Sequence, residues 1–257
     1  MTEVVIFTEV RIIIFLFGII IGSFLNVCIF RLPRNEGIIF GRSHCLSCGN
    51  VLRWYELIPV VSYVIQRGRC RSCGERISLQ YPLVELLNGV CWLWIFWVRG
   101  IGLDGLILSL AASVLIVVAV IDWKTYQIPF GCNIAIGILG ILRLALEPSF
   151  WPVHVIGLFT VSVPFLIIYL VSSGQAIGGG DVKLMAAAGL LLGWRNILLA
   201  LMLGSVAASV IHLTLMRLKG RDRVLAFGPY LAFGIMTAML YGDKIIHWYL
   251  GTFIGVG

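Results

Sequence analysis

Two pairs of cysteines and two isolated aspartates are the residues of this sequence whose types and spacing could do chemistry. Cys45 and Cys48 form one Cys-x-x-Cys pair, and Cys70 and Cys73 form a second after 21 intervening residues. Each pair can present two thiolates from one tight turn, and two such turns complete a closed tetrahedral site. We therefore predict a zinc ion with a structural role, bound by these four cysteines.

The residues around the cysteines agree with this prediction. Gly49 and Gly74 each follow the second cysteine of a pair, where such a turn often needs positive φ. His44 adjoins Cys45, but four ligands are already present, so we interpret it as an ordinary loop residue. The alternative is two redox-active pairs, a reading that the absence of a thioredoxin-like βαβ pattern disfavours.

Asp181 stands in an unusual setting. It follows three glycines at 178–180, and the uncharged run after Lys183 covers only 184–194, which is too short to cross a bilayer. A helix that spans here must draw Lys183, Asp181 and the glycines below the lipid headgroups. Non-helical backbone at that depth is tolerated only where it packs within protein or lines a wet cavity. We therefore expect the glycine segment to line a cavity, as a hydrolase in a membrane would require.

Asp122 ends an earlier apolar run, shortly before Pro129, a residue placed to begin the next helix. Two carboxylates brought close share one proton, so one can act as base on a water while the other polarises a carbonyl. Asp122 and Asp181 are thus a candidate pair for peptide-bond hydrolysis. The alternatives are that Asp122 is a loop residue paired with Lys124 and that the glycines form a hinge or a phosphate-binding turn.

Composition sets the environment in which these groups act. The chain has 257 residues, of which 60% are hydrophobic and 12% charged, with a mean hydropathy of +1.02. An ordinary soluble domain has about 25% charged residues, so lipid must be the solvent for most of this protein. The net charge of +7 comes from basic residues clustered in a few loops. This pattern favours contact with anionic lipid and excludes a nucleic-acid partner.

The stretches between charges predict eight membrane passes. We expect them at residues 12–30, 77–98, 105–121, 125–142, 148–173, 182–194, 196–216 and 224–242. Two glutamates precede the first run and no Ala-x-Ala site follows it, so we interpret it as a retained helix. With the N-terminus outside, 14 of the 19 basic residues fall in inside segments, including 217–223. Both aspartates and the cysteine loop are then cytoplasmic.

The predicted architecture is an all-α polytopic membrane protein with a small zinc-stapled cytoplasmic domain between its first two helices. We divide the chain into a first transmembrane helix at 1–30, a four-cysteine domain at 31–80 and a seven-helix membrane domain at 81–257. A loop of about 50 residues is near the lower limit for an independent fold, so the metal would act as its staple.

In this order the motifs resemble those of the bacterial type IV prepilin peptidases, which belong with the Gly-x-Gly-Asp intramembrane aspartyl proteases. The resemblance covers nearly the whole chain and rests, beside the cysteines and aspartates, on residues 22–27, 31–33, 81–85, 178–183 and 227–229. It implies that Asp122 and Asp181 are catalytic and that the four cysteines hold zinc. It also implies an active-site loop that contains Gly178, Gly180 and Lys183.

The resemblance implies a bifunctional enzyme of the bacterial inner membrane. Such enzymes cleave the basic leader from prepilins or type II secretion pseudopilins at the cytoplasmic face and then methylate the new N-terminus with S-adenosylmethionine. The methyltransferase region would be residues 31–80. No motif identifies the residues that bind the methyl donor; Glu85 and Asn26, in apolar surroundings, could serve it or form interhelical hydrogen bonds.

Two departures and two rival functions remain. Family members usually carry an aspartate where this chain has Phe130 and often a proline where it has Leu46. A proton-coupled transporter could use the two aspartates as a relay. A non-catalytic assembly factor that binds pilin precursors would not need them.

Overall fold

The computed structural model describes residues 2–219 and 225–254, which are mostly helical. The segment between Arg34 and Gln80 is largely loop, with two short helical elements and two isolated β-bridges. The helices fall into two compact units, one ending at Ile101 and the other beginning at Gly102. The all-α fold is therefore confirmed. The three-part division of the chain predicted above stays a prediction.

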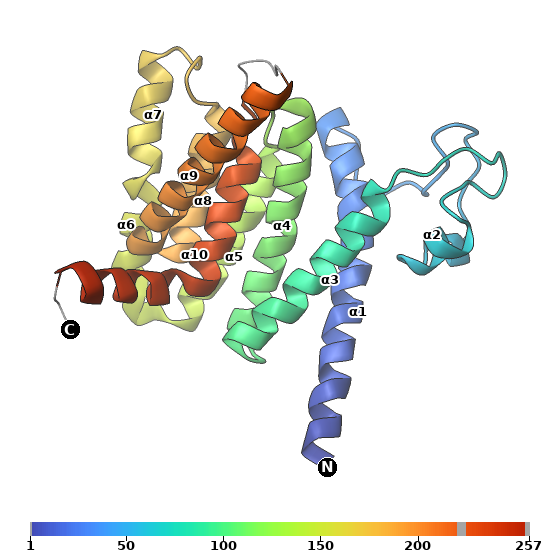
Figure 1. Cartoon of the computed structure of the whole chain (residues 1–257), viewed down its shortest axis with the longest axis horizontal. Coiled ribbons are helices and arrows are strands. Elements are labelled where there is room, and N and C mark those ends of the chain that lie inside the picture. The colour runs from blue at the N-terminus through green and yellow to red at the C-terminus, as the bar shows by residue number, and fades with distance from the viewer. Residues whose placement is uncertain (1, 220–224, 255–257) are drawn as a thin grey trace. The chain divides into compact units, whose positions relative to one another are not determined.

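The N-terminal unit consists of two long helices and the segment that connects them. It contains α1 (Thr2–Arg31), η1 (Leu32–Arg34), η2 (Trp54–Leu57), α2 (Val61–Ile65) and α3 (Gln80–Arg99). Helices α1 and α3 pack along each other (Figure 1), because glycines of α1 face α3. A Cβ at Gly22 would lie 2.7 Å from the Cα of Glu85, so only glycine allows this approach. The cysteines lie in the connecting segment.

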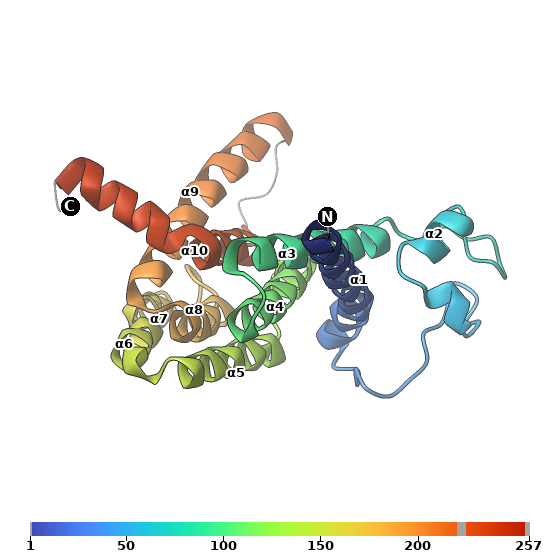
Figure 2. The same cartoon turned by 90° about the horizontal axis from the view of Figure 1, so that it is seen from below.

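The C-terminal unit is a helical bundle. Its elements are α4 (Leu103–Thr125), α5 (Phe130–Leu146), η3 (Pro148–Phe150), α6 (Trp151–Thr160), α7 (Ser162–Val171), α8 (Gly179–Leu192), α9 (Trp194–Lys219), α10 (Gly228–Tyr249) and η4 (Leu250–Ile254). Helix α8 packs against α5, α6, α7, α9 and α10, as the view from below shows (Figure 2). The side chains of Leu184, Met185 and Leu191 are fully buried. This short helix is the centre of the bundle.

Five helical segments within the described residues are long and apolar enough to cross a membrane. They are Glu9–Arg34, Gln80–Arg99, Leu103–Thr125, Pro148–Val171 and Trp194–Thr214. Helix α5 is apolar but shorter. Helix α8 has 14 residues and is therefore about 21 Å long at about 1.5 Å per residue, less than the roughly 30 Å of a hydrocarbon core. The short helix expected after Asp181 is present.

Two helix boundaries differ from the sequence prediction. Helix α5 begins at Phe130 instead of residue 125, because Tyr126 adopts a left-handed φ of 55° that ends α4 and Pro129 caps α5. The predicted pass 148–173 is interrupted at Val161 between α6 and α7, since Pro164 has no N–H for the preceding turn. The predicted inside segment 217–223 and the start of the predicted pass 224–242 lie partly outside the described residues.

Candidate functional site

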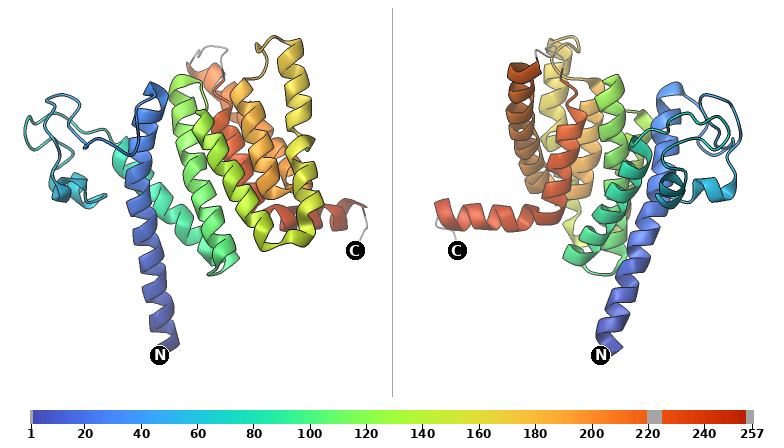
Figure 3. Two further views of the ribbon diagram at one scale, coloured as in Figure 1. Left: turned by 180° about the vertical axis from the view of Figure 1, so that it is seen from behind. Right: turned by 45° about the vertical axis from the view of Figure 1, so that its right-hand side comes forward.

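Asp122 lies in the last turn of α4, with 5% of its surface exposed. Its Oδ2 accepts a hydrogen bond of 2.8 Å from the backbone N–H of Gly228, the first residue of α10. Helix α4 packs against both α5 and α10 in the bundle (Figure 3). Asp122 is therefore a buried carboxylate within a helix, anchored at the N-terminus of α10, and not the loop residue that the sequence left open.

Asp181 lies in the first turn of α8 and is half-buried. Its carboxylate accepts a hydrogen bond from the backbone N–H of Gly178, the N-cap of the helix. This is the reach-back contact of a capping box, in which the third helical residue bonds the N-cap N–H. The helix thus starts within the glycine segment: Gly179 and Gly180 are helical. The expectation that the glycine segment lines a cavity stays a prediction.

The two carboxylates lie near each other, close enough for their charges to interact. The connection between α4 and α5 helps to bring them together. Gly180 packs against Ile128 of this connection, and a Cβ at Gly180 would lie 3.0 Å from the Ile128 Cβ. The start of α8 therefore packs against the connection that follows α4, three residues after that helix ends at Thr125.

The side chain of Lys183 does not face Asp181. Its side chain is exposed, and its Nζ lies 5.0 Å from the centre of the Phe130 ring, a cation–π contact. Residues two apart on a helix do not face each other, which agrees with the position of Lys183 relative to Asp181. The ring at position 130, which departs from the usual aspartate, here contacts a cation of the candidate site. Sequence reasoning missed this contact.

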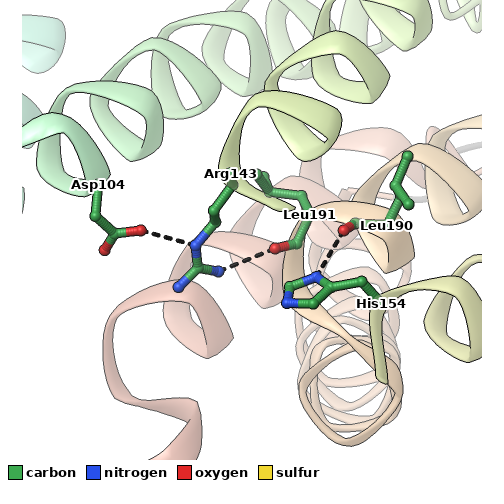
Figure 4. A network of polar contacts seen from close by, with 5 residues as sticks. All are labelled: Asp104, Arg143, His154, Leu190 and Leu191. Atoms are coloured by element: carbon green, nitrogen blue, oxygen red, sulfur yellow. Dashed lines mark hydrogen bonds and ion pairs between the residues drawn. The ribbon is translucent and has the colours of Figure 1, made fainter. Parts of the chain in front are cut away.

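The far end of α8 is held by polar side chains from two other helices (Figure 4). The Nη1 of Arg143 donates to the Leu191 carbonyl at 2.9 Å, and its Nε lies 2.8 Å from Oδ1 of Asp104. His154 Nδ1 lies 2.8 Å from the Leu190 carbonyl and acts as donor there. The last carbonyls of a helix have no partner within it, so these side chains satisfy them inside the bundle. The network fixes the helix that carries Asp181.

The four cysteines come together as the spacing predicted. Their sulfur atoms all lie within 4.8 Å of one another, a cluster that could hold a metal ion. Gly49 and Gly74 have φ of 71° and 73°, and their N–H groups each donate to the first cysteine of their pair at 2.9 Å. Asn50 Nδ2 donates to Ser72 Oγ at 2.7 Å and joins the two turns. His44 lies outside the cluster.

The thiols of the cysteine cluster differ in pKa. Backbone N–H groups of Cys48 and Ser47 lower the pKa of the Cys45 thiol to about 6. The Glu75 N–H favours the Cys73 thiolate, but desolvation and the neighbouring thiols outweigh it and raise the pKa of Cys73 to about 12. A metal ion needs thiolates as ligands, so its binding here must displace at least one proton.

Comparison with known proteins identifies the family of this chain. Residues 16–99 match the Bacterial Peptidase A24 N-terminal domain, and residues 109–213 match the Type IV leader peptidase family. The prepilin leader peptidase/N-methyltransferase of Bacillus subtilis (strain 168) is 36% identical over 248 residues, covering 95% of this chain and 99% of that protein. Those of Legionella pneumophila and Aeromonas hydrophila are 30% and 33% identical, over 92% and 94% of this chain and 93% and 94% of their own lengths. No solved structure matches significantly. The chain belongs to the type IV leader peptidase family.

Proposed function

We propose that this protein cleaves the basic leader from type IV prepilins or type II secretion pseudopilins and then methylates the new N-terminus. The names of its relatives include both activities, and these relatives align with this chain over nearly their whole length. That agreement supports an enzyme and gives no support to the transporter or the assembly factor.

Asp122 and Asp181 are the proposed catalytic pair. The observation that carries the proposal is that their charges interact and that α8 packs against the connection that follows α4. Each is oriented by a backbone N–H, from Gly228 and Gly178 respectively. Two such carboxylates hold one proton between them. The ionised member takes a proton from the attacking water, while the protonated member donates a hydrogen bond to the scissile carbonyl.

The remaining elements of the site have supporting roles. Gly180 allows the start of α8 to approach the α4–α5 connection, Gly178 lies against the Asp181 side chain, and Lys183 stays on the exposed side. We propose that α1, α3, α4, α5, the α6–α7 pair, α8, α9 and α10 give eight passes through the bacterial inner membrane. The distribution of basic residues supports a cytoplasmic position for the cysteines and both aspartates.

The metal of the cysteine cluster is proposed to be zinc with a structural role. Four thiolates are the ligand set of closed zinc sites, and a tetrahedral site of this kind leaves no open position for a reactant. The Cys45 and Cys73 sulfurs are 3.9 Å apart, close to the edge of such a tetrahedron. Methyl transfer would use S-adenosylmethionine.

Purified full-length protein in liposomes, incubated with a prepilin and S-adenosylmethionine, tests the proposed function. We expect mass spectrometry to find a pilin that has lost its leader and carries one methyl group on its new N-terminus. An intact prepilin after incubation with well-folded protein would contradict the peptidase assignment. A cleaved but unmethylated product would contradict the transferase assignment alone.

A further inference from the structure

The N-terminal unit contains a cavity of about 800 Å³ for which neither of the preceding sites accounts. Its walls are the cysteine segment, the end of α1 and the start of α3. The lining includes Ser23, Asn26, Cys45, Cys70, Tyr81 and Glu85. Its volume lies within the roughly 300–1,000 Å³ that small-molecule sites occupy, and it combines apolar walls with a few polar groups.

Glu85 is the most unusual residue of this lining. Four carboxylates line the cavity, and Glu85 is the one that is buried, with 6% of its surface exposed. Its Oε2 accepts a hydrogen bond of 2.7 Å from the Val60 N–H, and the Ser23 side chain hydrogen-bonds to the same carboxylate. Both partners are neutral. A buried carboxylate held by neutral donors is a favourable contact for a cationic ligand, since charge-assisted contacts are the strong ones.

Val60, whose N–H donates to Glu85, has a strained backbone conformation. Val60 has φ 60° and ψ −51°, and the Val61 N–H donates to the Pro59 carbonyl at 2.6 Å. This is a γ-turn with positive φ, a rare conformation that a β-branched residue adopts only when its surroundings impose it. Glu85 therefore fixes a strained turn beside the cavity. Such strain is concentrated at ligand clamps and other functional sites.

We propose that this cavity binds S-adenosylmethionine and that Glu85 faces its sulfonium. The proposal deepens the methyltransferase half of the proposed function and rests on it. Three features of the ligand have counterparts in the lining: the buried Glu85 for the sulfonium cation, the rings of Phe30 and Tyr63 for the adenine, and Arg42 or Arg76 for the carboxylate. The bound ligand would supply an electrophilic methyl group.

Placing the methyl donor in this cavity explains why the cysteine cluster lies beside it. Cys45 and Cys70 belong to the wall of the cavity, so a metal that joins the two turns would also fix the shape of this wall. A structural metal ion thereby supports a ligand site without touching the ligand. The residues that would hold the methyl donor come from α1, α3 and the connecting segment, all within the N-terminal unit.

Binding of two ligands that differ by one charge tests the assignment. S-adenosylhomocysteine keeps the adenosine and amino-acid groups but has a neutral thioether. In full-length protein, we expect Glu85→Gln to weaken S-adenosylmethionine binding about tenfold, the effect of one charge-assisted contact. The affinity for S-adenosylhomocysteine should change less than about twofold, because Gln can still accept the Val60 N–H and a neutral ligand loses no charge contact. Glu147→Gln, in the C-terminal unit, is the charge control and should change neither affinity.

Two results would overturn the assignment. One is equal affinity of the Glu85→Gln and wild-type proteins for S-adenosylmethionine, and the other is equal weakening of both ligands, which would leave Glu85 a purely structural role. Hydrogen exchange locates the site: protection by S-adenosylmethionine should fall on residues 56–63 and not solely beyond Gly102. Asp122→Asn protein should bind the ligand normally. Cleavage and ligand binding are therefore tested separately, so a wrong assignment of the aspartate pair can be told apart from a wrong assignment of this cavity.

Discussion

The backbone N–H of Gly228 lies 2.8 Å from Oδ2 of Asp122, although the two residues are 106 positions apart. Asp181 makes the matching contact with the N–H of Gly178. Each aspartate is therefore oriented by the start of a helix, α10 in one case and α8 in the other. An ionised carboxylate accepts at about four lone-pair sites, so both retain capacity for a water or a substrate carbonyl.

Gly228→Ala should damage cleavage more than folding. An added Cβ would lie 2.8 Å from Oδ2 and 3.0 Å from the Cβ of Asp122, so the carboxylate must move. A displacement of about 1 Å can cost about 100-fold in rate, and we expect a loss of at least about tenfold in single-turnover cleavage. Gly131→Ala is the matched control, since a Cβ there meets nothing within 4 Å. Wild-type cleavage by Gly228→Ala would show that Asp122 is not held in this way.

Phe130→Leu should release Lys183. An exposed cation–π contact contributes about 0.5–1 kcal/mol, so we expect kcat/KM for prepilin cleavage to fall about two- to fivefold. Phe130→Tyr keeps the ring and should retain wild-type activity. A double-mutant cycle with Lys183→Met measures the coupling directly. Strictly additive effects of the two substitutions would mean that the contact plays no part in the reaction.

Metal analysis of purified protein tests the cysteine cluster. Wild-type protein should carry about one zinc per chain, and the Cys45→Ser/Cys70→Ser variant should carry almost none. Cys91→Ser, which changes a cysteine outside the cluster, is the control and should retain the metal. Unchanged zinc content in the double variant would disprove the site. Because zinc binding displaces protons from the thiols, the affinity for zinc should fall as the pH is lowered.

Arg143→Leu should destabilise the bundle. The substitution removes the donors to the Leu191 carbonyl and to Asp104. An unsatisfied buried group costs about 1–3 kcal/mol, so the midpoint of thermal unfolding should fall by several degrees. Arg195→Leu removes an equal charge from an exposed position and serves as the control. Equal melting of the two variants would contradict a role of Arg143 in holding α8.

The sequence predicted the elements of this fold where local signals are strong. Apolar runs located the helices, and the two Cys-x-x-Cys pairs with Gly49 and Gly74 located the cysteine cluster, because turn geometry depends on neighbouring residues. The short helix after Asp181 followed from counting uncharged residues. These features depend on spacing alone.

Long-range contacts could not be predicted in this way. Nothing near Asp122 in the sequence indicates that Gly228 is its partner, and nothing near Glu85 indicates that it holds the strained turn at Val60. The interaction of Phe130 with Lys183 also needs the close approach of α5 and α8. A carboxylate in an apolar run marks a residue as unusual, but the sequence does not indicate which distant residue it contacts.

The most direct test of the aspartate pair is prepilin cleavage by the wild-type, Asp122→Asn and Asp181→Asn proteins, each with its folding checked by thermal unfolding. Asp243→Asn, which changes an exposed aspartate, is the control. We expect both site variants to fold and to lose cleavage by at least about 10³-fold, because neither can share the proton, while the control cleaves normally. Substantial cleavage by either folded site variant would contradict the two-aspartate mechanism.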